Sequence, residues 1–165
     1  MHRTNRWSIA WAGLMALCAV AFPAATRVAA QDGGISTLAG NWVGGGQIKL
    51  EDGRSERLSC RANYIAREGG SSLVMSIRCA SQSYKLEFRS SMRVAGGRVS
   101  GTWEERSFNA AGSLSGSSSS GNLQLSFSGT LTGNLSVSYG SSNQRVSIST
   151  GGGGISRVSV SLSRG

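Results

Sequence analysis

The chain has 165 residues, enough for one domain around one hydrophobic core, and its 17 Lys and Arg outnumber its 8 Asp and Glu, a formal net charge of +9. Its one histidine is His2, so no Ser-His-Asp triad, Cys-His pair or histidine zinc site can form beyond the first residues. We therefore expect neither an enzyme nor a cofactor.

The first thirty residues have the layout of a secretory signal peptide. Arg3 and Arg6 are followed by an apolar run over residues 7–25, and small residues precede a cut after Ala30. Pro23 interrupts the run, so we expect it to be cleaved off and the mature chain to have no membrane span. The remaining 135 residues (165 minus 30) carry a net charge of +6, and the sequence predicts a periplasmic or secreted protein.

Residues 31–38 follow as a short N-terminal arm, and residues 39–165 then show one repeated pattern. Apolar residues recur at every second position in segment after segment, which is typical of a β-strand with one face in water. In the first of these segments Trp42 and Ile48 share the inward face, and the Asp52-Gly53 pair after it is the signal of a tight hairpin turn.

Two cysteines lie on the apolar faces of the next two segments. Cys60 and Cys79 are separated by 18 residues in a chain predicted to enter an oxidising compartment, whereas Cys18 lies in the predicted signal peptide. We expect a disulfide between them, worth about 3 kcal/mol through the entropy of the closed loop.

The central segments supply candidates for contact with a ligand inside the domain. At inward positions stand Tyr84, Phe88, Trp103 and Glu105. Three of the four are aromatic, and Glu105 lies near a strand end, where a carboxylate is usually solvated.

Arginines dominate the outward positions of the same segments. Arg57, Arg61, Arg78 and Arg89 would gather on neighbouring strands as a basic wall for an anionic partner such as lipopolysaccharide, a cell-wall polymer or an acidic protein surface. Interleaved glutamates predict ordinary cross-strand ion pairs as the alternative. We expect no binding of nucleic acid, because the exposed aromatic side chains needed for base stacking are missing.

The second half is rich in serine and glycine but keeps the alternation. We expect residues 112–121 and 150–154 to be mobile and the segments around them to be strands with serine facing water. Eight to nine short strands without a crossover helix predict a single antiparallel up-and-down β-barrel, since closure removes exposed edges. A β-sandwich is the alternative, whereas the polar outer face argues against an outer-membrane barrel.

The opening of the first strand, LAGNWVG, resembles the G-x-W start of the calycin barrels: lipocalins, fatty-acid-binding proteins, avidins and bacterial metalloprotease inhibitors. The matching residues are Gly40 and Trp42. The resemblance implies that Trp42 closes one end of the barrel and that an arginine of the last strand, Arg157 or Arg164, packs across its ring. It does not extend to biotin or retinoid specificity, because the tryptophans of avidins and the helix of lipocalins are missing.

Three functions follow from this sequence. The first is an exported, non-enzymatic binding protein with a small apolar ligand inside the barrel, or a partner at a rim formed by the loops at 66–71 and 112–121. The second is an inhibitor-like protein that inserts residues 31–38 into a partner, and the third binds anionic envelope polymer through the outward arginines.

Glycines at inward positions, such as Gly46 and Gly129, mean either that the strands bend there or that the interior is hollow.

Overall fold

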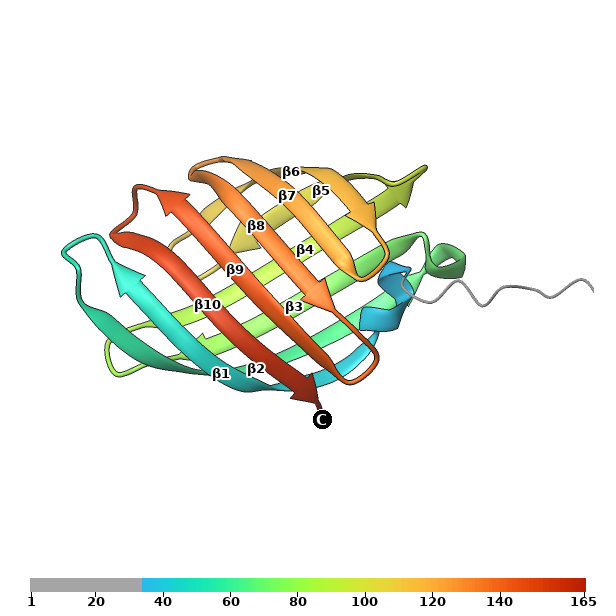
Figure 1. The fold of residues 1–165 in the computed structure, drawn as a ribbon. Helices are drawn as coiled ribbons and strands as arrows, with labels where there is room; N and C mark the ends of the chain where they lie inside the picture. The colour runs from blue at the N-terminus through green and yellow to red at the C-terminus, as the bar shows by residue number, and fades with distance from the viewer. Residues whose placement is uncertain (1–33) are drawn as a thin grey trace, which may run out of the picture. The chain divides into compact units, whose positions relative to one another are not determined.

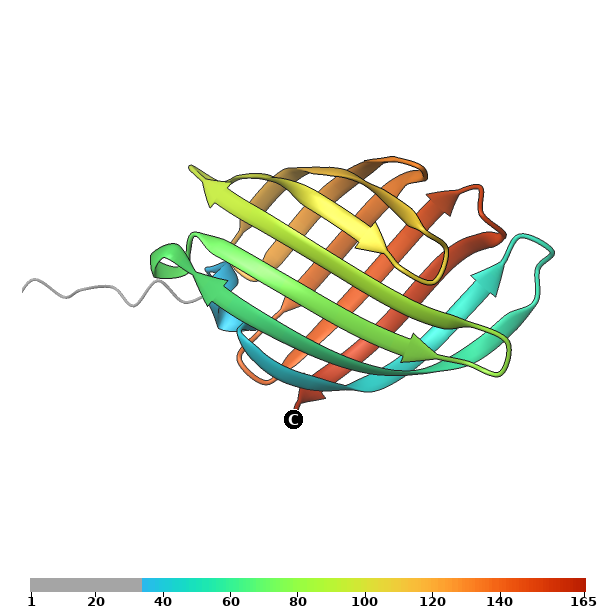
Figure 2. The same ribbon diagram turned by 180° about the vertical axis from the view of Figure 1, so that it is seen from behind.

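The computed structural model describes residues 34–165, which form a closed antiparallel barrel of ten strands (Figures 1 and 2). The predicted signal peptide, residues 1–30, and the first residues of the predicted arm lie outside the described residues. The strands are β1 (Gly40–Leu50), β2 (Ser55–Arg67), β3 (Ser72–Ala80), β4 (Lys85–Ala95), β5 (Arg98–Glu105), β6 (Ala110–Ser119), β7 (Asn122–Gly129), β8 (Thr132–Tyr139), β9 (Asn143–Gly151) and β10 (Ile155–Arg164). Two short 3₁₀ helices, η1 (Ile35–Leu38) and η2 (Glu68–Gly70), complete the described part.

Each strand pairs with the next strand along the chain, and β1 pairs with β10 to close the barrel. The predicted up-and-down barrel is therefore confirmed, and the β-sandwich alternative is wrong. Closure pairs the backbone of every strand on both sides, which removes the exposed edges that a flat sheet would have. Among residues 34–165, no helix is long and apolar enough to cross a membrane.

The strand number is ten rather than eight to nine, because the segment predicted to be a mobile loop is β6. Residues 112–119 pair with β5 on one side and with β7 on the other. Its inward positions carry Gly112, Leu114 and Gly116, so only one large apolar residue marks the alternation. The signal for a strand was weak at this point because the strand presents glycine, not side-chain volume, to the interior.

The inward glycines allow neighbouring backbones to approach closely. A Cβ atom added at Gly46 would collide with the carbonyl oxygen of Ser159, and one added at Gly129 would collide with that of Ala111. Gly129 also has φ of +137°, a conformation that other residues rarely adopt. At these positions the structure supports bending and close approach of the strands, not a hollow.

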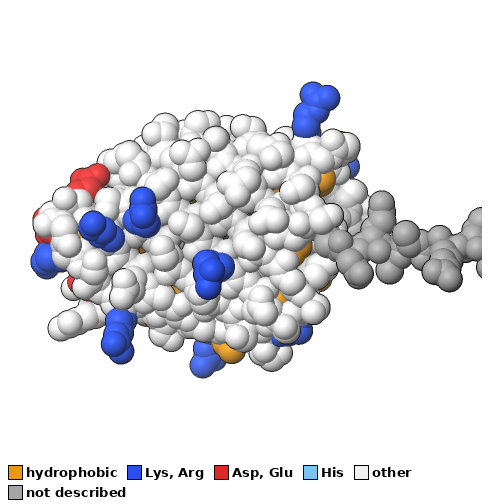
Figure 3. Space-filling view, viewed as in Figure 1, with side chains coloured by type: hydrophobic (Ala, Val, Ile, Leu, Met, Phe, Trp, Pro, Cys, Tyr) orange, Lys and Arg blue, Asp and Glu red, His pale blue; other side chains and the backbone are white. Residues whose placement is uncertain are grey.

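Apolar side chains from all ten strands point to one enclosed centre, and the outer face is formed by serine and by charged residues. Ser113, Ser126, Ser136, Ser147 and Ser159 stand outward on five successive strands. Figure 3 shows the face over β7 to β10, on which single Lys and Arg side chains are scattered and hydrophobic side chains are barely visible. The second half of the chain is thus an ordered part of the barrel wall.

A hydrogen bond crosses the interior between β2 and β9, two strands that are separated by β1 and β10 in the barrel. The Tyr64 hydroxyl on β2 donates to Gln144 Oε1 on β9 at 3.2 Å, and both residues are buried. Burial raises the pKa of Tyr64 well above its ordinary value. The pair therefore ties two distant strands together through groups that must stay uncharged.

Tyr64→Phe is expected to lower the free energy of unfolding by about 1–3 kcal/mol at neutral pH, because Gln144 Oε1 loses its donor. Because the folded-state pKa of Tyr64 lies above the unfolded-state value near 10, its contribution to stability is full below pH 10 and is lost as the pH rises further. The wild type should lose about 1.4 kcal/mol through this group between pH 9 and pH 11. Denaturant unfolding at the two pH values measures both effects.

Burial raises the pKa of Tyr139 as well. The Tyr64→Phe variant should therefore still lose some stability between pH 9 and pH 11, but less than the wild type. The double variant Tyr64→Phe/Gln144→Leu is the control, since replacing both partners removes the orphaned acceptor and should restore stability. Equal alkaline losses in wild type and Tyr64→Phe would contradict the assignment.

Candidate functional site

Trp42 lies at the end of the barrel where β1 begins, beneath η1. The indole is fully buried, and its Nε1–H donates to the carbonyl oxygen of Leu38 in η1 at 2.7 Å. The guanidinium of Arg164 lies over the ring, with its Cζ 4.5 Å from the ring centre. Arg164 donates to the carbonyl oxygens of Thr37, Ala39 and Ser141 at 2.7–2.8 Å. The indole and the guanidinium together fasten η1 across this end.

Of the two arginines proposed for this role, Arg164 fills it and Arg157 does not. Arg157 stands opposite Lys49 of β1 on the outer face, several residues from Trp42 along the barrel. Arg164 pairs in register with Trp42 and has the same parity as the buried Val160 and Leu162. That parity is a signal in the sequence that separates the two candidates.

Of the predicted arm, the structure describes residues 34–38. Ile35 and Leu38 of η1 are 2% and 1% exposed and belong to the hydrophobic core. The cross-strand pair Cys60–Cys79 forms the predicted disulfide between β2 and β3, with a Cα–Cα distance of 4.1 Å. The Trp42 end of the barrel is therefore filled by η1 and the indole.

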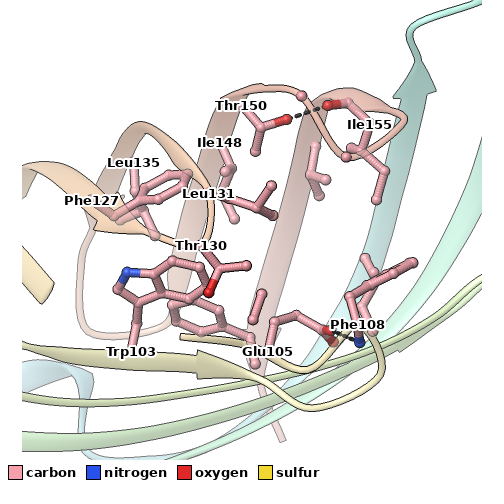
Figure 4. Close-up of a pocket in the computed structure, with 16 residues that line it drawn as sticks. Trp103, Glu105, Phe108, Phe127, Thr130, Leu131, Leu135, Ile148, Thr150 and Ile155 are labelled. Carbon is pink, nitrogen blue, oxygen red and sulfur yellow. Dashed lines mark hydrogen bonds between the residues drawn. The ribbon is translucent and has the colours of Figure 1, made fainter. Parts of the chain in front are cut away.

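A cavity of about 300 Å³ occupies the opposite end (Figure 4). Its walls come from the strand ends and turns at that end, and the lining residues are Leu86, Phe88, Trp103, Glu105, Phe108, Ala110, Phe127, Thr130, Leu131, Leu135, Ile148, Thr150, Gly152, Gly153, Ile155 and Val158. Most of these side chains are apolar. The cavity reaches the surface beside the turns, where the Phe108 side chain is 45% exposed.

Three aromatic rings form one wall of the cavity. Phe88 and Trp103 are stacked, with ring centres 6.3 Å apart, and the Phe127 ring meets Trp103 edge-on at 5.4 Å. The indole Nε1–H of Trp103 donates to the carbonyl oxygen of Ser128 at 3.2 Å, which fixes the ring. Such a wall offers a large apolar surface at little cost in side-chain freedom.

The polar groups of the cavity are held by backbone atoms. Thr130 Oγ1 donates to the Ala111 carbonyl oxygen at 3.2 Å, and the Thr150 hydroxyl donates to the carbonyl oxygen of Ile155. The Glu105 carboxylate accepts the Glu87 N–H at 2.5 Å and the Phe108 N–H at 2.8 Å. Figure 4 shows the bond between Glu105 and Phe108 at the edge of the cavity.

Three of the four predicted interior residues therefore meet in this cavity, and one does not. Phe88, Trp103 and Glu105 line it, whereas Tyr84 lies in the turn between β3 and β4, with its ring centre 6.4 Å from that of Phe108. Sequence reasoning did not single out Phe108 or Phe127. The alternation of Leu123, Leu125 and Phe127 could have found Phe127, but Phe108 stands in a turn, where no periodicity applies.

The rim of the cavity is also built from turns other than those predicted. Residues 106–109, 130–131 and 152–154 connect strands at the cavity end. The predicted rim loop at 66–71 contains η2 and lies at the Trp42 end, where Gly70 approaches Ser36 of η1, and the predicted loop at 112–121 is mostly β6. Successive turns of an antiparallel barrel alternate between its two ends, so the turns after β5, β7 and β9 share the cavity end, and the turns after β2 and β6 lie at the other.

The outward arginines form the predicted wall only in part. Glu87 Oε1 lies 3.3 Å from Arg78 Nη2, 3.1 Å from Arg89 Nη2 and 3.7 Å from Arg106 Nη1. The hydrogen bond from Arg78, followed by that from Arg89, lowers the pKa of Glu87. These arginines are therefore engaged in the cross-strand ion pairs that the sequence offered as the alternative.

Two further members of the wall have no such partner within residues 34–165. On the outer face, Arg61 stands opposite Arg78, and Arg57 stands opposite Gln47. Neither Arg61 nor Arg57 forms an ion pair with a described residue. Arg61, Arg78 and Lys85 contribute to a shallow surface groove across β1 to β4. The same groove is also lined by Glu87, the ion-pair partner of Arg78.

Comparisons with known proteins relate the chain through its fold. It is similar to Rv2717c from M. tuberculosis, whose crystal structure matches with a TM-score of 0.65 at 18% sequence identity, over 79% of this chain and 94% of that one. The likeness is one of fold. No protein-family model and no curated protein sequence matches the chain.

The cavity offers mainly apolar and aromatic contacts. Within residues 34–165, no group of three or more His, Cys, Asp or Glu residues lies close enough to hold a metal ion. The walls offer apolar and aromatic surface, one carboxylate and two hydroxyls already bonded to the backbone. A small cavity of this composition suits an apolar molecule with few polar groups.

Proposed function

We propose that this chain is an exported, non-enzymatic binding protein that holds a small apolar ligand in the cavity at the end of the barrel opposite Trp42. The cavity itself is the observation that carries the proposal. Its volume of about 300 Å³ lies at the lower end of the range for small-molecule sites, and its lining is mostly apolar. The aromatic wall of Phe88, Trp103 and Phe127 would supply most of the contact area.

The division of the barrel into two ends supports the same function. Trp42 and η1 fill one end, so a ligand would enter from the other, between Phe108 and the turn at Gly152. We also propose a relationship to the calycin barrels, supported by Gly40 and Trp42 in the first strand and by the arginine of the last strand on the indole. The disulfide supports export through an oxidising compartment.

Two other functions remain as predictions from the sequence. For the inhibitor-like function, η1 is part of the core, so an inserting arm would consist of residues before Ile35. For the binding of an anionic polymer, Arg57 and Arg61 are the arginines of the wall outside the ion pairs of Glu87. The cavity is favoured because it combines enclosure, aromatic surface and an opening.

Filling the cavity should weaken binding. Ala110 lines the cavity from the start of β6 and is 3% exposed, so Ala110→Leu would place three extra carbon atoms in the ligand space. We expect the affinity for a neutral apolar probe, 2-(1-naphthyl)ethanol, to fall about tenfold or more, because overpacking costs about 1–3 kcal/mol. Isothermal titration calorimetry measures the affinity, and native mass spectrometry of gently extracted protein tests for a co-purified ligand.

The neighbouring residue supplies the control. Ala111 stands on the outer face of the same strand, so Ala111→Leu adds the same volume outside the barrel and should leave the affinity unchanged. The proposal would be overturned if the probe failed to bind the wild type, or if both variants bound it as the wild type does.

A further inference from the structure

A single charged side chain lines the cavity. Of its sixteen lining residues, Glu105 alone carries a charge, and no Lys or Arg is among them. A cavity that is otherwise apolar screens this charge poorly, so its sign affects every ligand that enters. The cavity therefore has a negative wall and lacks a cation that could receive a ligand carboxylate.

The nearby arginines do not neutralise this carboxylate. Arg89 and Arg106, on the adjacent stretches of chain, lie 3.1 and 3.7 Å from Glu87 on the outer face. Within residues 34–165, no Lys or Arg nitrogen lies within 4.0 Å of the Glu105 carboxylate. Its negative charge is thus balanced by backbone N–H dipoles and not by a cation.

The hydrogen bonds of Glu105 position the carboxylate and leave part of its capacity free. An ionised carboxylate has about four acceptor sites, and the N–H groups of Glu87 and Phe108 occupy one on each oxygen. These two bonds also fix the direction of the side chain at the edge of the cavity (Figure 4). A donor on a ligand would find a pre-oriented acceptor there.

The adjacent wall favours a cation over a neutral donor. Phe88 and Trp103 line the same cavity as Glu105, and Phe88 stands directly opposite Glu105 in the pairing of β4 with β5. Aromatic ring faces carry partial negative charge and attract an ammonium group. The carboxylate and the rings therefore act in the same direction.

We infer that the cavity selects small apolar amines, with the ammonium group on Glu105 and the hydrocarbon part among Phe88, Trp103 and Phe127, and that it rejects carboxylic acids of the same shape. The inference rests on the proposed function, because it names the class of ligand for that same cavity. The volume of about 300 Å³ limits the ligand to a small molecule of about one or two rings.

Three probes on one carbon skeleton test the selection: 2-(1-naphthyl)ethylamine, 2-(1-naphthyl)ethanol and 1-naphthylacetic acid, titrated by calorimetry at neutral pH. In the wild type we expect the amine to bind about 10- to 100-fold more tightly than the alcohol, the strength of a hydrogen bond to a charged group, and the acid to bind more weakly than the alcohol. In Glu105→Gln the preference of amine over alcohol should fall to less than threefold.

The ratio between two probes is the decisive readout, because a general loss of cavity shape in Glu105→Gln would weaken the amine and the alcohol alike. Glu104→Gln is the matched control. It removes the same charge from the adjacent residue, whose side chain points outward and is 52% exposed, and it should leave the ratio at the wild-type value.

The outcomes separate the two proposals. Failure of all three probes to bind the wild type would overturn the proposed function and this inference with it. Binding of the acid as tight as that of the amine, or an unchanged amine-to-alcohol ratio in Glu105→Gln, would overturn the inference and leave the binding function standing.

Discussion

Replacing Trp42 with alanine is expected to lower the free energy of unfolding by about 3–5 kcal/mol. The indole is 0% exposed, donates to the Leu38 carbonyl oxygen and supports the guanidinium of Arg164. Alanine would leave a void beneath η1, an acceptor without its donor, and a guanidinium without the ring beneath it. Denaturant unfolding followed by circular dichroism measures the loss, which should appear as a lower midpoint with a similar slope.

Two further variants make this prediction specific. Val43→Ala, one residue along the same strand and 45% exposed, should change stability by no more than about 0.5 kcal/mol. A double-mutant cycle between Trp42→Ala and Arg164→Ala should show a coupling of about 0.5–2 kcal/mol, because the ring and the guanidinium are in contact. A loss below about 1 kcal/mol in Trp42→Ala would mean that the indole is not what closes this end.

Reduction of the Cys60–Cys79 disulfide is expected to cost about 3 kcal/mol of stability. The bond joins residues 19 apart in the chain, and its loss would free that loop in the unfolded state. In the folded state the two cysteines stay neighbours, because β2 and β3 pair in register at this position. The effect should therefore fall on the unfolded state, and the barrel should remain folded when reduced.

Comparison of the oxidised and reduced wild type under denaturant measures this effect without a change of side chain. Cys60→Ala/Cys79→Ala should lose more than the reduced protein does, because both sulfurs are buried and alanine leaves space in the wall. Coincident unfolding curves for the oxidised and reduced protein would contradict a role of the bond in stability.

The first of these effects belongs to the Trp42 end, and the binding proposals belong to the other. The filled end, with η1, Trp42 and Arg164, provides stability that the cavity end does not have to supply. The cavity end can therefore carry an unfilled volume and a carboxylate without an ion-pair partner, features that cost free energy in a core. Rigid support at one end and a binding site at the other is a common arrangement for sites placed at strand ends and turns.

Several features of the barrel could be read from the amino-acid sequence alone. Alternation of apolar and polar residues predicts a strand because successive side chains point to opposite faces. This local rule identified nine of the ten strands, and it placed Trp103 and Glu105 at inward positions. The same parity put Cys60 and Cys79 on the inner faces of successive strands, where they form the disulfide. Local geometry was sufficient for these predictions because neighbouring strands follow one another along the chain.

Tertiary structure decided the features that depend on which strands meet, and at what register. Parity in the sequence separates Arg164 from Arg157, but only the pairing of β1 with β10 brings residues 42 and 164 together, more than a hundred positions apart in the chain. Strand β6 could be recognised only through its partners, since Leu114 is the one large apolar residue at its inward positions. The cavity, finally, is the space left where side chains from seven strands and three turns fail to fill one end, and no local pattern encodes a volume that is set by closure of the whole barrel.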